Sequence, residues 1–326
     1  MRIVSISLAL LSGIVGAGFA SGREIARFFS GHGAACAAAV VSAGAALLFF
    51  FLRLCAKMDR FGADGAAALC RARFGARLGA VCTGLFVLLC AVTAGAMLAA
   101  CAELSALTLP MRHAYGAGMA FSLALGLFLA RREGGLAFSG AALLLVLPVL
   151  LVRLLLLPAG EACFYPAMAP DLPVRAAADG LSYAALNAAM LLGVSPMLLP
   201  LENRQRTKAV FLFCLLFCAL LILGSAVCSR HLPVAMSHPM PFVALSRRLG
   251  GGYLLVALCL YAAALSTLSA MLLGVARMLP LSRGRALLLS GAAALLFARA
   301  GFGSLVQSAY PVLGAVCAAL LLLLCA

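Results

Sequence analysis

Ten long apolar runs follow one another along this chain, and they constrain its fold more than any other feature. Short segments with charged residues, proline or glycine separate the runs. Of all residues, 66% are hydrophobic and only 10% are charged, whereas soluble proteins carry roughly 25% charged residues. About 20 apolar residues are enough for a helix to cross a bilayer. The sequence therefore predicts an all-α membrane protein with ten transmembrane helices, at about residues 3–29, 34–56, 79–107, 115–130, 135–157, 180–200, 208–229, 252–278, 285–299 and 303–325.

Basic residues gather in every second connection between these runs, above all in 53–77, 204–208 and 277–285. Cytoplasmic loops of membrane proteins carry an excess of lysine and arginine. This bias predicts that the N- and C-termini both lie in the cytoplasm. It also accounts for the net charge of +15. The expected partners are therefore the lipid bilayer and a small-molecule solute, and no nucleic acid.

The spacing of the runs repeats between the two halves of the chain. The first five runs begin near residues 3, 34, 79, 115 and 135, and the last five near 180, 208, 252, 285 and 303. Because five is an odd number of crossings, two matched halves would lie inverted relative to each other. We expect a single transmembrane domain over residues 1–326, in which repeat one covers about 1–157, a linker 158–179 and repeat two about 180–326.

The stretch GAGFASGREIARFF, residues 16–29, interrupts the first run at a depth where a membrane helix should be continuous. Glycine lowers helix propensity by about 1 kcal/mol relative to alanine, and three glycines lie close together here, Gly16, Gly18 and Gly22. Ser21 and Glu24 then have the S-x-x-E spacing of a capping box that starts a helix. The pattern predicts one helix that ends near Val15–Gly18 and a second that runs from Ser21 to about Ser30.

The run at 180–200 has a similar interruption. Gly193 is followed by Ser195-Pro196, and serine before proline is a good helix start. Paired broken helices at equivalent places in two repeats indicate a transporter binding site. Broken ends offer free N–H groups that suit a carboxylate and free carbonyls that suit a cation. We expect the solute to contact both interruptions and one amide, which gives the candidate set Gly16, Ala17, Gly18, Phe19, Ala20, Ser21, Gly22, Asn187, Gly193 and Ser195.

Other interpretations of these features stay open at this point. Residues 1–20 resemble a cleaved signal peptide, whose removal would leave nine spans. Gly18 and Gly22 have the spacing of a helix-packing motif, and Asn187 also suits an interhelical hydrogen bond. Glu24 is expected to cap the second half-helix, with proton carriage as its alternative role.

Residues 16–29 resemble the signature of the bacterial YkvI membrane proteins, G-A-G-F-A-S-G-[QR]-E-I-x-x-F-F. The LNAAM and SPMLLPL segments within 186–201 are more loosely similar. YkvI proteins are grouped with the amino acid–polyamine–cation superfamily, whose members share the inverted-repeat fold of LeuT. The resemblance implies a LeuT-like fold over the whole chain and a location in the bacterial plasma (inner) membrane. It implies no particular substrate.

The same resemblance implies a sodium site. LeuT-like sodium transporters use carbonyls near the break of helix one and an Ala-x-x-Thr-Ser motif on helix eight. Helix eight of this chain reads YAAALSTLSAM, which has that spacing with the two hydroxyl types exchanged. The alternatives are hydroxyls bonded within their own helix and H⁺ as the coupling ion, and no cofactor is expected. The implied Na⁺ ligands are Val15, Gly18, Ala263, Ser266 and Thr267.

Further polar residues lie within or between the runs. Glu103 and Arg153 are considered as an ion pair, since intramembrane charge is costly unless paired. Residues 57–78 are expected to form a cytoplasmic surface helix. Prolines within 231–250 predict an outer lid that is not one continuous helix. The candidates for lining a cavity are Tyr183, Tyr261, Gln307 and Tyr310.

Together these patterns favour a secondary active transporter. We expect it to move a small organic solute that carries a carboxylate, an amino acid or a relative, by ion-coupled alternating access. The chain has no G-x-x-x-x-G-K-[ST] loop for ATP and no catalytic motif, so no enzymatic activity is expected. The alternative is a membrane receptor or sensor that keeps a transporter fold and binds its solute without net transport.

Overall fold

A computed structural model describes residues 2–131, 137–158, 172–192, 198–250 and 252–326; for Arg2, 137–143 and 172 it describes the backbone alone. These ranges are helical and contain no strand. In chain order the elements are α1 (Arg2–Ile14), α2 (Ala17–Ala20), α3 (Arg23–Phe28), η1 (Ser30–Ala35), α4 (Cys36–Phe61), α5 (Ala66–Thr108), α6 (Ala114–Arg131), α7 (Ala137–Leu155), α8 (Leu172–Leu191), α9 (Asn203–Arg230), α10 (Leu232–Ser237), α11 (Pro241–Ser246), η3 (Arg247–Leu249), α12 (Tyr253–Met278), α13 (Arg283–Ala298), α14 (Phe302–Ser304), η4 (Leu305–Ala309) and α15 (Tyr310–Cys325).

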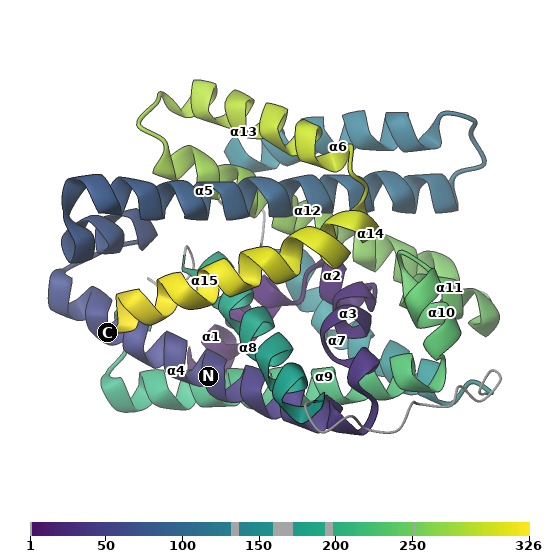
Figure 1. The fold of residues 1–326 in the computed structure, drawn as a ribbon. Helices are drawn as coiled ribbons and strands as arrows, with labels where there is room; N and C mark the ends of the chain where they lie inside the picture. Colours follow the sequence, from purple (N-terminus) through teal and green to yellow (C-terminus); the bar gives the residue numbers. More distant parts are fainter. Residues whose placement is uncertain (1, 132–136, 159–171, 193–197, 251) are drawn as a thin grey trace.

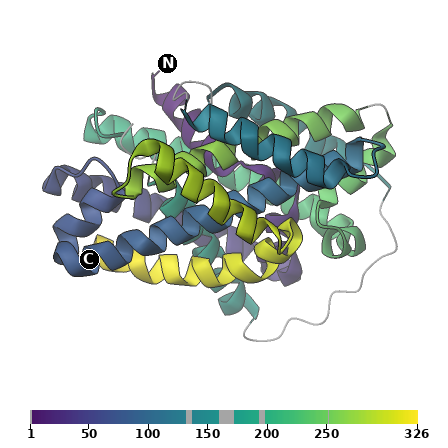
Figure 2. The same ribbon diagram turned by 90° about the horizontal axis from the view of Figure 1, so that it is seen from above.

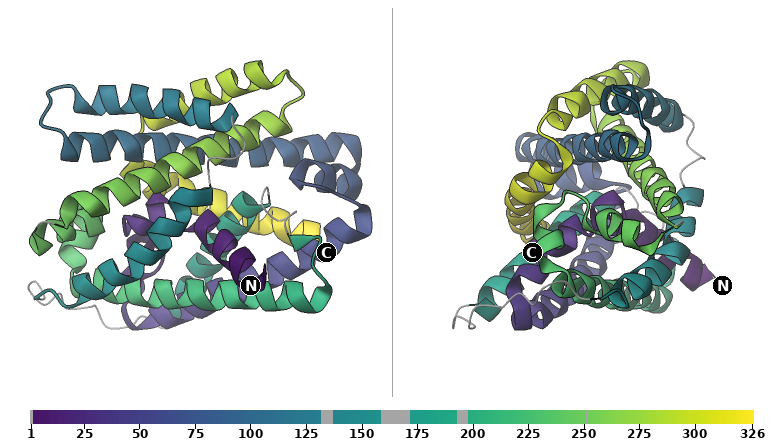
Figure 3. Two further views of the ribbon diagram at one scale, coloured as in Figure 1. Left: turned by 180° about the vertical axis from the view of Figure 1, so that it is seen from behind. Right: turned by 90° about the vertical axis from the view of Figure 1, so that its right-hand side faces the viewer.

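The long helices run roughly side by side and enclose the short ones. Helix α5 crosses the whole molecule, with α6 and α13 on one side and α15 on the other (Figure 1). The view from above shows α15 beside α5 again (Figure 2). Helices α4 and α9 pack together along the opposite edge, while α12 crosses obliquely and contacts α5, α6, α7 and α13 (Figure 3). The short helices α2 and α3 lie in the middle of this bundle.

Six stretches among the described residues are long and apolar enough to cross a membrane: Ser30–Phe61, Ala66–Thr108, Ala114–Arg131, Asn203–Arg230, Tyr253–Met278 and Phe302–Cys325. Large apolar side chains such as Phe121, Leu258 and Leu296 are exposed on the outside of the bundle, where lipid would cover them. These six stretches do not establish the ten predicted spans. Helices α1 and α13 fall short of a span by their length, since α1 has 13 residues and α13 has 16.

The helix boundaries agree with the predicted runs at several places and differ at two. Helix α8 begins at Leu172, earlier than the predicted residue 180. The expected surface helix at 57–78 is wrong as a single element, because α4 continues to Phe61 and α5 begins at Ala66. Helix α5 then bends sharply at Gly75, so its first turns leave the axis of the rest.

Residues 232–249 form two short helices and one 3-10 turn, α10, α11 and η3, which we call the lid. The prediction that this segment is not one continuous helix is confirmed. Prolines explain the division, since Pro233 and Pro241 each occupy the first turn of a new helix. The lid covers one end of the bundle, the lid end, while the start of α5 lies at the opposite end (Figure 1).

Candidate solute- and ion-binding site

The first apolar run is interrupted inside the core, as predicted. Helix α1 ends at Ile14, α2 covers only Ala17–Ala20, and α3 begins at Arg23. The backbone between α1 and α2 is sharply turned, and the Gly16 N–H donates a 2.7 Å hydrogen bond to the carbonyl of Ile14. All residues from 14 to 22 are buried. Irregular backbone at this depth is tolerated in a membrane protein only where protein or a polar cavity covers it.

The predicted capping box is wrong. Gly22, not Ser21, is the N-cap of α3, and its φ of 84° lies in the left-handed region that favours glycine. The Ser21 hydroxyl donates to the Gly18 carbonyl at 3.0 Å and accepts from the Arg23 N–H at 3.4 Å. The Ser21 N–H donates to Ala17, so it is not available to Glu24. Glu24 turns instead toward α8.

Helix α12 packs directly against the break. A β-carbon at Gly16 would lie 2.9 Å from the Oγ1 atom of Thr267, so only glycine allows this approach. Ala263 is buried, whereas Ser266 and Thr267 are partly exposed. The structure thus brings a hydroxyl of the expected sodium motif to the interruption. Hydroxyl and carbonyl oxygens are hard ligands that suit a monovalent cation.

Helix α8 packs on the other half of the break. The Tyr183 hydroxyl donates a 2.8 Å hydrogen bond to Oε2 of Glu24. The second carboxylate oxygen of Glu24 lies directly against Gly18, where any side chain would displace it. The ring of Tyr183 is fixed by Phe28, with a centroid distance of 5.0 Å, and by Phe29 at 5.2 Å. A membrane-buried carboxylate therefore faces the interrupted backbone.

Two further hydroxyls complete this cluster. Tyr310, the first residue of α15, lies within electrostatic reach of Glu24 and Tyr183, and its hydroxyl faces Thr93 of α5. Apart from each other, the Tyr310 and Thr93 hydroxyls have no hydrogen-bond partner within the described part of the chain. Both side chains are at most 1% exposed. Buried polar groups are normally paired, so these two hydroxyls are candidates to bind a polar solute.

Asn187 lies next to this cluster, one turn after Tyr183 on α8. Its Nδ2 donates a 2.8 Å hydrogen bond to the Tyr183 carbonyl, and the side chain is 3% exposed. Helix α8 ends at Leu191. The other two candidates on this run, Gly193 and Ser195, lie outside the described residues. The predicted second interruption is therefore not tested.

The lid closes one end of the bundle over α3. Arg23 donates to the carbonyls of Met236 and His238 at 3.2 and 3.3 Å, and to Oε1 of Gln307 at 2.7 Å. The Phe242 N–H donates to the Ser21 carbonyl at 2.9 Å. These bonds connect the turn before α3 to the lid and to η4.

A proline explains a further contact between α3 and η4. Pro311 has no N–H and cannot donate to the carbonyl of Gln307, and the chain forms a π-turn at η4 just before it. Arg27 Nε donates to that carbonyl at 3.3 Å. Single π-helical turns within helices are frequent at functional sites, and this one is followed directly by Tyr310.

The ion pair between Glu103 and Arg153 that the sequence suggested is wrong. Oε1 of Glu103 accepts a hydrogen bond from the Phe302 N–H at 3.1 Å, because the start of α14 packs on the end of α5. Arg153 is exposed on α7. Among the other cavity candidates, the Tyr261 hydroxyl is bonded to Ser122 at 2.7 Å, away from the break.

A cleft of about 580 Å³ opens at the end of the bundle opposite the lid. Its mouth carries Asp64, Arg71 and Arg277, and its inner wall includes Ala189 and Leu192 of the α8 end. The last turns of α12 form another wall. The cleft thus leads from a charged surface toward the end of α8, which packs beside the broken helix.

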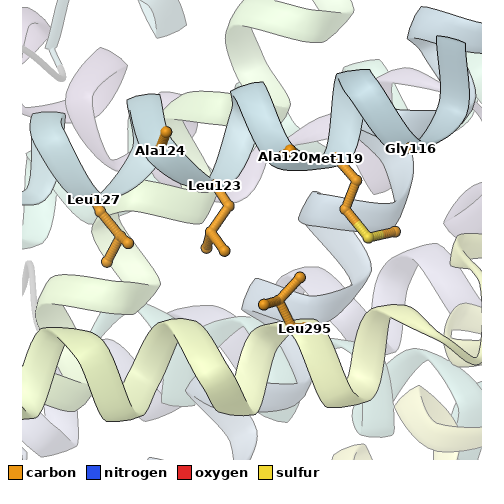
Figure 4. Close-up of a pocket in the computed structure, with 7 residues that line it drawn as sticks. All are labelled: Gly116, Met119, Ala120, Leu123, Ala124, Leu127 and Leu295. Atoms are coloured by element: carbon orange, nitrogen blue, oxygen red, sulfur yellow. The ribbon is translucent and has the colours of Figure 1, made fainter. Parts of the chain in front are cut away.

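A second cavity, of about 470 Å³, lies between α6 and α13 (Figure 4). Met119, Leu123 and Leu127 of α6 point toward Leu295 of α13. Every residue that lines this groove is apolar or glycine. It offers nothing to orient a polar solute, so the break and its polar cluster are the better candidate site.

The sequence did not reveal the centre of the cluster. Thr93 lies in a continuous apolar helix, and nothing in its neighbourhood marks it. The S-x-x-E spacing favoured a capping role for Glu24, whereas its true partner is 159 positions away. The sequence did carry one useful signal, because Tyr183 and Tyr310 are polar residues within apolar runs.

Comparison with known proteins gives a structural match. No family model and no curated protein sequence matches the chain. A solved structure of Mhp1, a nucleobase-cation-symport-1 family transporter in a closed conformation with bromovinylhydantoin bound, is similar with a TM-score of 0.66. The alignment covers 95% of this chain and 74% of Mhp1 at 15% sequence identity. The chain therefore has the same fold as Mhp1, and its long apolar helices are those of an integral membrane protein.

Proposed function

We propose that this protein is a cation-coupled secondary transporter of a small organic solute. In this proposal ten helices cross the bacterial plasma membrane as a 5+5 inverted repeat, and both termini lie in the cytoplasm. The stretch at 16–29 supports membership of the YkvI family. The proposed solute carries a carboxylate and is an amino acid or a relative, whereas the solute in the Mhp1 structure is a hydantoin.

The observation that carries the proposal is the buried break between α1 and α3. It places turned backbone and a short isolated helix at the centre of a membrane bundle, where unpaired backbone groups cost several kcal/mol. Helices α8 and α12 pack on opposite halves of the break with Tyr183 and Thr267. Such a costly arrangement is expected where a solute and an ion bind.

The two ends of the bundle support alternating access. The lid is hydrogen-bonded to α3 at one end, while a cleft of about 580 Å³ opens at the other. The positive-inside bias of the loops puts the cleft in contact with the cytoplasm. We therefore propose that this conformation faces inward, and that transport requires the Arg23 contacts with the lid to break.

The proposed ion is Na⁺, held by Val15, Gly18, Ala263, Ser266 and Thr267. The approach of Thr267 to Gly16 supports this set. The Gly18 carbonyl already accepts the Ser21 hydroxyl, so it would be shared. A carbonyl oxygen has two lone pairs and accepts both partners.

Uptake into proteoliposomes tests the proposal. We expect accumulation of labelled amino acid from a mixture, driven by an imposed Na⁺ gradient. Thr267→Val should lower the Na⁺-driven rate at least about tenfold, because it removes a hydroxyl ligand from the proposed cation site. Thr83→Val is the matched control, since the Thr83 hydroxyl bonds only the Gly79 carbonyl of its own helix.

The same assay separates the transporter from the receptor alternative. A solute that stabilises the purified protein yet never crosses the bilayer, under a Na⁺ or an H⁺ gradient, would favour the receptor. Equal loss of uptake in Thr267→Val and Thr83→Val would refute the sodium set.

A further inference from the structure

Glu24 is a buried carboxylate without a counter-charge. Its side chain is 7% exposed, and among the described residues no arginine, lysine or histidine lies within salt-bridge distance of it. The nearest cation along the chain, Arg23, points outward to the lid and Gln307. Burying an ionised carboxylate without a partner is very costly. A bound cationic group would remove that cost.

The surroundings of Glu24 are built from four different elements. Tyr183 of α8 donates to one carboxylate oxygen, and Gly18 of α2 leaves room for the other. Tyr310 of α15 and Thr93 of α5 add two hydroxyls that no described residue outside this pair satisfies. These elements are far apart in sequence and converge only at the break.

We propose that Glu24 binds the cationic nitrogen of the transported solute, with the hydroxyls of Tyr310 and Thr93 as additional acceptors. This inference rests on the proposed function and deepens it. The solute is then an amino acid or an amine with a free ammonium group. A carboxylate on the same solute would face the interrupted backbone of residues 16–22.

The chemistry favours an ammonium group over a metal ion at this position. An ammonium has three N–H donors, and the cluster offers a carboxylate and two hydroxyls as acceptors. A divalent metal would need further acidic ligands, and the described residues contain no group of three His, Cys, Asp or Glu side chains that would hold one. Three residues of the sodium set, Ala263, Ser266 and Thr267, belong to α12, which approaches the break at Gly16 and not at Glu24.

The test is a thermal-shift screen on the purified full chain in detergent with 100 mM Na⁺ (about physiological ionic strength). The probes are the proteinogenic amino acids, putrescine and spermidine, each beside its counterpart in which hydrogen or hydroxyl replaces the amino group. A ligand that binds only the folded state raises the midpoint of unfolding. We expect at least one ammonium-bearing probe to raise the midpoint and its counterpart to leave it unchanged.

Variants then assign the ammonium to Glu24. In Glu24→Gln the dissociation constant of the active probe should rise about 10- to 100-fold, as for loss of a hydrogen bond to a charged group. The charge control is Glu202→Gln, an exposed position next to α9, which should bind within about twofold of the parent protein.

A second pair of variants covers the case in which Glu24→Gln does not fold. Tyr310→Phe should weaken binding about 3- to 10-fold while the unliganded protein unfolds at nearly the same temperature, because among the described residues the removed hydroxyl faces only the Thr93 hydroxyl. Tyr261→Phe is its control and should keep the affinity, since that hydroxyl is bonded to Ser122 away from the break.

The outcomes separate this inference from the proposed function. If the active probes lack an ammonium group, if no ammonium-bearing probe raises the midpoint, or if Glu24→Gln or Tyr310→Phe binds as tightly as the parent, the inference is overturned. A solute without a nitrogen that still accumulates in proteoliposomes would overturn the inference and leave the transporter intact. An ammonium solute that binds through Glu24 but never crosses the bilayer supports this binding site and refutes transport.

Discussion

Gly22 forms the turn between α2 and α3. Its φ of 84° is rarely adopted by residues with a side chain. The ring of Phe242 from the lid closes on the same residue, so that a β-carbon there would lie 2.8 Å from ring carbons. Backbone conformation and lid packing therefore depend on the same missing side chain.

Gly22→Ala should destabilise the protein by about 2–4 kcal/mol, the sum of left-handed strain and overpacking. Gly62→Ala is a matched comparison, because Gly62 has a φ of 60° with nothing within 4 Å of its β-position. That variant should lose only the strain, about 1 kcal/mol. Unfolding midpoints in detergent measure both. Equal midpoints for the two variants would show that Phe242 does not press on Gly22.

At this scale the sequence predicts positions better than partners. The glycines correctly located the break, because they act locally on the backbone, whereas the helix start predicted at Ser21 was wrong. The role of Glu24 was missed, because a local capping rule competes with a contact that exists only after α8 has packed. Thr93 carries no local signal at all, since its importance comes from its neighbour Tyr310 on α15.

Arg206 joins the segment before α9 to α4. It is 5% exposed at the start of α9 and donates to the carbonyls of Leu198, Leu199 and Leu201 at 3.1–3.3 Å. Its Nη1 atom also pairs with Asp59 near the end of α4. One guanidinium thus holds the approach to α9 against α4.

Arg206→Lys should lower stability by about 1–3 kcal/mol, because a lysine ammonium cannot span a carboxylate and three carbonyls. Arg204→Lys, an exposed change on the same first turn, should be neutral within about 0.5 kcal/mol. The unfolding midpoint again reports the difference. A midpoint for Arg206→Lys that matches Arg204→Lys would mean that this fork contributes nothing.

Helix existence was predictable from the apolar runs, and helix ends were less so. Helices α6, α12 and α13 begin and end within a few residues of the predicted runs. Helix α8 starts early because its first turns include Arg175 and Asp179, charged residues that hydropathy assigns to a loop. Asp179 is stabilised within the bundle because it pairs with Arg27 at the end of α3 and with His32 in η1. A charged residue can therefore belong to the first turns of α8.

The two ends of the molecule differ, because one is closed and the other is open. The lid and Gln307 hold α3 at one end, and the cleft opens at the other. The alternating arrangement of apolar runs and basic loops predicted a membrane bundle, and the likeness to Mhp1 supports its fold. Which end is closed was not predictable, because it depends on side-chain contacts between the lid and residues more than 200 positions earlier.

The most direct measurement is an experimental structure of the protein with a stabilising solute from the screen. The account predicts solute density between Gly18, Glu24 and Tyr183, beside Thr267, with α1, α2 and α3 still separate. Density confined to the apolar groove between α6 and α13, or a continuous helix through residues 14–23, would contradict it.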